Sequence, residues 1–170
     1  MKGHPVYAFS IAVHATAGVV GFALGLVMAL QPRLATKRAL LVIYVAAMIV
    51  LVVGLAVAVV AEWSQMEDAR RAVDVGLILL GLYTLLRAIQ AVAAVRTARP
   101  GWQVAFVDHV GFTLISLFDG FVIVAAINLG APMPVVILLA LLGVGGGIAA
   151  INRMKTRVDR GTRAPSARVR

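Results

Sequence analysis

The chain of 170 residues contains no cysteine. Disulfides, thiolate nucleophiles, iron–sulfur ligation and cysteine-based zinc sites are therefore excluded for it. Charged residues are scarce too, at 14%, whereas about 25% is typical of a soluble globular domain. The sequence has no Gly-x-Ser-x-Gly, His-Glu-x-x-His or phosphate-loop motif, so no enzymatic reaction is indicated.

Hydrophobic residues, in contrast, make up 62% of the chain and are arranged in long runs. Such runs predict an all-α integral membrane bundle, because a helix that crosses ~30 Å of hydrocarbon at ~1.5 Å per residue needs about 20 apolar residues. The five predicted spans are residues 6–30, 39–61, 72–95, 103–129 and 133–151. They form one domain over residues 1–152. A re-entrant hairpin made of the last two spans is the alternative.

Residues 153–170 are polar and rich in arginine, with proline and glycine. This composition predicts a disordered basic tail, because it offers too little apolar surface to form a core. We expect the tail to lie on anionic lipid at the cytoplasmic face. The basic residues assigned to this contact are Lys155, Arg157, Arg160 and Arg163. The net charge of +9 lies mainly in connections and tail, so no nucleic-acid partner is expected.

Lys and Arg are concentrated on one side of the predicted domain, where twelve of the 16 lie. These twelve are Arg33, Lys37, Arg38, Arg96, Arg99, Arg153, Lys155, Arg157, Arg160, Arg163, Arg168 and Arg170. Because cytoplasmic loops carry the excess of basic residues, the pattern predicts the N-terminus outside and the C-terminus in the cytoplasm. The abundance of Ala, Val, Arg and Gly is typical of a bacterial chain, so we expect the bacterial cytoplasmic (inner) membrane.

Ionisable residues lie deep inside the apolar runs, among them His14, Arg87, Asp108, His109 and Asp119. A charge in hydrocarbon is costly and requires a partner, a wet cavity or a function. At 100° per residue these side chains give spans one, three and four polar faces, so these spans are expected to surround the interior.

The other two predicted spans contain almost no polar residues. We expect them to face lipid or to pack against the bundle, with Tyr44 in an ordinary interfacial position. Gly143 and Gly147 of the last span have the small-xxx-small spacing that allows two helices to approach closely.

Helix rise converts sequence position into depth and pairs the charges. His14 and Asp119 fall at similar depths on the outer side, and Arg87 and Asp108 can meet on the inner side, with His109 beside them. Hydroxyls of Thr113 and Ser116 can connect the two pairs, because they donate and accept hydrogen bonds. Two interpretations stay open, a proton or ion relay and a set of structural clamps.

Cofactor and metal binding find less support. His14 and His109 differ by ~16 Å in depth, so they cannot both ligate one haem iron. A haem held by one histidine stays open. No His and carboxylate have the i, i+3 or i, i+4 spacing of a metal site on one helix, so none is predicted.

Residues 10–153 resemble uncharacterised small bacterial multi-pass membrane proteins. The matching pieces are His14-Ala15-Thr16-Ala17-Gly18, Phe106-Val107-Asp108-His109-Val110-Gly111-Phe112 and Leu117-Phe118-Asp119-Gly120. Some related families carry a second histidine in the first cytoplasmic loop, which here reads Ala35-Thr36-Lys37-Arg38. The resemblance implies the multi-pass architecture and no activity.

Three function classes follow from the sequence. The first is a small transporter or ion- or proton-translocating protein. The second is an accessory or structural subunit of a membrane complex, with a homo-oligomer or another membrane protein as partner. The third is a redox protein that binds haem through one histidine or binds a quinone.

Overall fold

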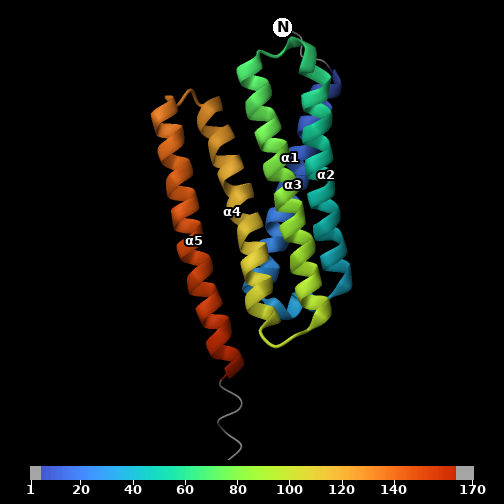
Figure 1. Ribbon diagram of the computed structural model, residues 1–170, viewed down its shortest axis with the longest axis vertical. Coiled ribbons are helices and arrows are strands. Elements are labelled where there is room, and N and C mark those ends of the chain that lie inside the picture. Colours follow the sequence, from blue (N-terminus) through green and yellow to red (C-terminus); the bar gives the residue numbers. More distant parts are fainter. Residues whose placement is uncertain (1–4, 164–170) are drawn as a thin grey trace, which may run out of the picture.

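The structure is a computed structural model that describes residues 5–163, without the side chains of Ala69, Thr162 and Arg163. Five long helices and two short 3₁₀ turns make up these residues (Figure 1). In chain order they are α1 (Pro5–Leu30), η1 (Pro32–Thr36), α2 (Arg38–Glu62), η2 (Trp63–Gln65), α3 (Asp68–Thr97), α4 (Trp102–Asn128) and α5 (Met133–Arg163). All five helices are long and apolar enough to cross a membrane. The predicted all-α bundle of five long apolar helices is therefore confirmed, and each helix could span a membrane.

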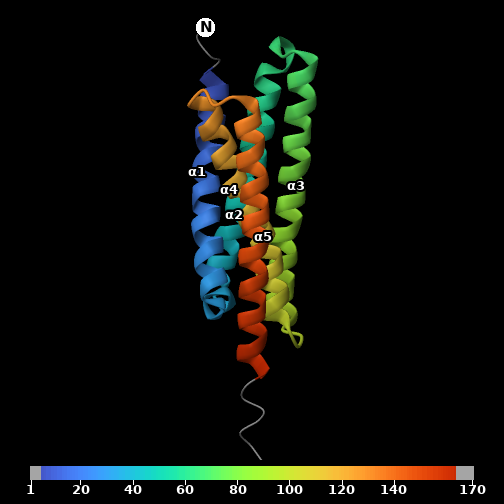
Figure 2. The ribbon, with the colours of Figure 1, turned by 90° about the vertical axis from the view of Figure 1, so that its left-hand side faces the viewer.

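Successive helices run in opposite directions, so the described chain begins and ends at opposite ends of the bundle (Figure 1). The first four helices form a closed group, in which α1 packs on α2 and α4, and α3 packs on the other side of the same two helices. The last helix, α5, packs on α4 at the outside of this group (Figure 2). α4 and α5 each run along the bundle, and each is long and apolar enough to cross a membrane by itself, which favours two spans over a re-entrant hairpin.

The core lies mainly between α1, α2 and α4. Its largest fully buried side chains come from these helices, and they are Tyr44, Phe106, Met28, Met48, Val107, Val110 and Thr113. In the most apolar stretch of α2, 39% of the residues are buried, against 6% in α5. Of the two alternatives expected for span two, facing lipid or packing against the bundle, the structure favours packing. A uniformly hydrophobic helix can be packed against other helices or exposed to lipid, because both surroundings are apolar. Hydrophobicity alone therefore does not predict how much of the helix is buried.

The two ends of the bundle differ in charge. At the end with η2, acidic and basic side chains pair, as Arg70 does with Glu62 at 3.1 Å and Arg71 with Asp68 at 2.9 Å. The other end, called here the basic end, is formed by η1, residues 98–101 and the last turns of α5. The basic residues of this end that belong to η1, α2 and α3 form no ion pair with any side chain that the structure describes.

The helix α5 continues to Arg163, twelve residues beyond the predicted end of the span at Ile151. The predicted disorder is therefore wrong for residues 153–163, and residues 164–170 lie outside the described part. Ile151, Met154 and Val158 pack against the core cluster. Their spacing of three and four residues forms an apolar stripe on one helix face, which stabilises the helix. The basic residues between them mask this pattern.

Close contact between α4 and α5 follows a repeat of four residues along α5. Gly143 lies on Asp119, Gly147 on Ile115, and Ile151 on Gly111. A Cβ on Gly147 would lie 2.5 Å from Cγ1 of Ile115, and one on Gly111 would lie 2.6 Å from Cδ1 of Ile151. The predicted role of Gly143 and Gly147 in close helix packing is confirmed, because a side chain at these positions would force the two helices apart.

Replacing Gly147 with alanine should lower the thermal stability of the purified protein in mild detergent. The added methyl group overlaps Ile115, and such overpacking costs about 1–3 kcal/mol. Gly145→Ala is the matched control, because no atom lies within 4 Å of a Cβ there. Its unfolding temperature should stay equal or rise, since alanine favours helix more than glycine. Equal unfolding temperatures for the two variants, measured by circular dichroism, would contradict the packing described here.

Candidate functional site

Asp108 of α4 lies between two cations from neighbouring helices. Its Oδ2 accepts a hydrogen bond from Nη2 of Arg87 in α3 at 2.7 Å. Its Oδ1 accepts one from Nζ of Lys155 in α5 at 2.6 Å. The predicted Arg87–Asp108 pair is therefore confirmed. We call these three residues the charge triad. It joins three helices through one carboxylate.

Aromatic side chains position Arg87 within the charge triad. The guanidinium lies 5.5 Å from the centre of the Phe112 ring, where a cation is attracted to the ring face. Tyr83, one turn before Arg87, contacts the same ring edge-to-face at 4.9 Å. The side chains of Arg87, Lys155 and Asp108 are 18%, 32% and 41% exposed, so water or lipid headgroups can reach the triad.

Lys155 was missed as a member of this cluster, and its predicted contact with lipid headgroups stays a proposal. A signal was present in the sequence, because Lys155 follows Ile151 by one helical turn on the stripe that faces α4. Arg157 and Arg160 are exposed, which leaves their predicted contact with lipid headgroups as a proposal. The side chain of Arg163 lies outside the described part.

Asp119 lies on the α5 side of α4, where its carboxylate fits into the space above Gly143. The residue is 9% exposed, and its Oδ1 is buried with no hydrogen-bond partner in the described part of the chain. Asp119 is four residues beyond the midpoint of α4, which is ~6 Å from the middle of the helix. Oδ1 of Asp119 is therefore a buried acidic oxygen near the middle of a helix, without a hydrogen-bond partner among the described residues.

His14 is not the partner of Asp119, because His14 contacts α2 whereas Asp119 contacts α5. Its Nδ1 lies 2.7 Å from the backbone carbonyl oxygen of Leu51 in α2, so it donates a hydrogen bond to that oxygen. Gly54 of α2 allows this close approach, since a Cβ there would lie 3.2 Å from that of His14. The predicted His14–Asp119 pair is therefore wrong. Two residues at similar depth can form a pair only if they face each other, and these two side chains face different neighbouring helices.

Thr113 takes part in a buried contact that the sequence did not predict. Its hydroxyl donates to the carbonyl of Val110 at 2.7 Å, so the hydroxyl of Tyr44 donates to Thr113 across 2.5 Å. Tyr44 and Thr113 are both completely buried, which contradicts the interfacial position predicted for Tyr44. Thr113 therefore connects α4 to α2 rather than bridging two charged pairs.

His109 and Ser116 do not join a continuous polar path within residues 5–163. Nδ1 of His109 is buried and has no hydrogen-bond partner there. Ser116 is half-buried, and no side-chain hydrogen bond links it to Asp119 or to Thr113 in the described range. The predicted connecting role of Ser116 is therefore wrong for this conformation. The polar groups of α4 form separate contacts with α2, α3 and α5.

Comparisons of the chain with protein-family models, curated proteins and solved structures found no match. Among the described residues, no group of three or more His, Asp or Glu is placed to hold a metal ion. The charge triad and Asp119 are therefore the candidate functional groups of this protein.

Asp108→Asn should destabilise the protein more than Lys155→Gln. The first variant removes the counter-charge of two cations, whereas the second leaves the Arg87–Asp108 pair intact. Because the triad is partly exposed, we expect a loss of about 1–3 kcal/mol for Asp108→Asn, below that of a fully buried pair. Thermal unfolding in mild detergent measures the difference. A loss for Lys155→Gln as large as that for Asp108→Asn would show that Asp108 does not depend on Arg87.

Proposed function

We propose that this protein translocates protons across the membrane and that Asp119 is its proton-binding group. The observation that supports the proposal is the buried Oδ1 of Asp119, which has no hydrogen-bond partner in the described part of the chain. An ionised carboxylate in such a place is costly, so the group is stable when it carries a proton. It releases that proton only when water or a base reaches it. These are the properties that a proton carrier requires.

In this proposal α5 controls access to Asp119. The helix contacts the rest of the bundle mainly through α4, and Gly143 lies directly on the carboxylate. A small displacement of α5 is enough to open the contact, because glycine contributes no side chain there. Few buried residues hold α5 in place, since only 6% of its most apolar stretch is buried. Elements that move in function are drawn from such weakly packed regions.

In the proposed path, Asp119 is the first proton-binding group and Asp108 of the charge triad is the second. Asp108 precedes Asp119 by eleven residues, which is about three helical turns, so both carboxylates lie on the face of α4 that contacts α5. The interval of ~16 Å is filled by the packing of Ile115 on Gly147 and of Ile151 on Gly111. In this conformation, these apolar contacts leave no space for water between Asp119 and Asp108. Proton passage requires α5 to separate from α4 so that water can enter.

The proposed direction follows from the basic end of the bundle. We place this end in the cytoplasm of a bacterium, because its arginines and lysines match the distribution that orients inner-membrane proteins. Asp119 then lies nearer the outer face, and the charge triad nearer the cytoplasm. Protons would pass from Asp119 toward Asp108 when they enter the cell.

Asp119→Asn should reduce proton flux at least tenfold in proteoliposomes, because an amide cannot exchange a proton near neutral pH. Flux is followed with a pH-sensitive dye trapped inside the vesicles, under a potassium diffusion potential set by valinomycin. Glu67→Gln is the matched control, since Glu67 is an exposed carboxylate outside the bundle core. Its flux should equal that of the unmodified protein.

Two results would contradict the proposal. One is unchanged flux in an Asp119→Asn variant that unfolds at the same temperature as the unmodified protein. The other is flux through the unmodified protein no greater than through empty vesicles.

The second candidate function is an accessory subunit of a membrane complex, favoured by the largely uncovered surface of α5. In that case the purified protein conducts no protons. It would also be recovered from mild detergent with a stoichiometric membrane-protein partner. The flux measurement therefore separates the two candidates.

A further inference from the structure

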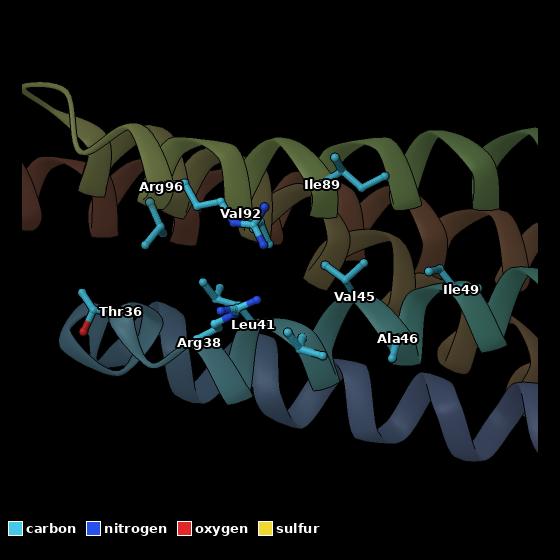
Figure 3. A pocket seen from close by; sticks show the side chains of 11 residues that line it. Thr36, Arg38, Leu41, Val45, Ala46, Ile49, Ile89, Val92 and Arg96 are labelled. Atoms are coloured by element: carbon cyan, nitrogen blue, oxygen red, sulfur yellow. The ribbon is translucent and has the colours of Figure 1, made fainter.

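An apolar groove lies between α2 and α3 at the basic end, remote from the α4–α5 contact (Figure 3). Its volume is about 840 Å³. The lining residues are Thr36, Arg38, Leu41, Val42, Val45, Ala46, Ile49, Ile89, Val92, Val95 and Arg96. Apart from Thr36 and the two arginines, the lining is aliphatic. The groove therefore combines a long apolar floor with cations at one end.

The two arginines lie on opposite walls of the groove. In Figure 3 the nitrogen-bearing ends of Arg38, from α2, and Arg96, from α3, extend into the space between these helices. Neither has an ion pair with an acidic side chain in the described part of the chain. Two like charges across one groove repel each other, so an anion between them would be bound favourably. The planar guanidinium group suits phosphate oxygens in particular.

The length of the groove matches one leaflet of a bilayer. Along α2 it extends from Arg38 to Ile49, a rise of ~16 Å. Half of the ~30 Å hydrocarbon thickness is ~15 Å. The arginines lie next to η1 and the α3–α4 connection, the level at which headgroups lie if the helices span the membrane. The aliphatic residues then extend to the middle of the bilayer.

We propose that this groove binds one anionic phospholipid, with its phosphate between Arg38 and Arg96 and one acyl chain between α2 and α3. The net negative charge of the lipid matters, because a zwitterionic headgroup brings its own cation toward two arginines. Basic pockets between membrane helices bind anionic headgroups for the same reason. This proposal depends neither on the orientation of the chain nor on proton translocation.

The test measures lipid binding to the full chain in detergent by native mass spectrometry. The probes are phosphatidylglycerol, phosphatidylcholine with the same acyl chains, and inorganic phosphate. Arg38→Gln/Arg96→Gln removes both cations of the groove. Arg33→Gln/Arg99→Gln is the matched control, because it removes the same charge from exposed positions at the same end that do not line the groove.

A second pair of variants tests the place of the acyl chain. Val42→Trp fills the groove from an exposed position on its wall. Val50→Trp is its control, since Val50 is an exposed residue of α2 that does not line the groove. Both positions are exposed, so neither substitution disturbs the core. Unfolding temperatures confirm that all variants are folded.

We expect one phosphatidylglycerol per chain and weak binding of phosphatidylcholine. Binding should weaken roughly 25-fold in Arg38→Gln/Arg96→Gln, because each basic residue near a lipid phosphate contributes about a factor of five. It should also weaken in Val42→Trp, while the two controls bind as the unmodified protein does.

Four results would overturn the proposal. Equal binding of phosphatidylcholine removes the preference for charge, and equal loss in both double variants shows diffuse attraction. Displacement of the lipid by inorganic phosphate identifies a site for free phosphate. Unchanged binding in Val42→Trp excludes the acyl chain from the groove.

Discussion

The close contact between α4 and α5 is the interaction on which the polar chemistry of this protein depends. In a membrane, apolar side chains gain little by leaving lipid for protein, so helices associate through close packing and polar contacts. Gly143, Gly147 and Gly111 supply that packing on both helices. At this distance Gly143 covers Asp119 and Lys155 reaches Asp108. With bulkier residues in the contact, both carboxylates would lose these neighbours.

The two carboxylates on this contact have opposite surroundings. Asp108 is neutralised by Arg87 and Lys155 and is partly open at the basic end. Asp119 is buried, and its Oδ1 has no hydrogen-bond partner in the described chain. Charge-assisted hydrogen bonds stabilise the first arrangement, whereas the second costs free energy unless the acid is protonated. This difference is the reason that Asp119, rather than Asp108, is proposed as the proton-binding group. The charge triad has the geometry of a structural clamp, and the relay interpretation rests on Asp119 alone.

Much of the architecture could be predicted from sequence, and each failure has an identifiable physical cause. The spans and the Arg87–Asp108 pair follow from helix length and rise, which depend on the backbone alone. The His14–Asp119 pair failed because depth does not say which neighbour a helix face meets. The burial of Tyr44 was missed because a hydroxyl near a span end is equally compatible with an interface or with a partner such as Thr113. Lys155 was hidden within a run of basic residues that was interpreted by composition rather than by periodicity.

The sequence by itself determined five apolar helices, their approximate ends, the glycine spacing of the last helix and the excess of basic residues at one end. These properties are local, since they depend on residue type and on the regular geometry of one helix. Only the tertiary structure decided that α2 has the most buried apolar stretch, that α5 packs on α4, and that His14 contacts α2. The physical reason is that rotation and neighbour choice arise from packing between helices, where several arrangements bury similar apolar surface.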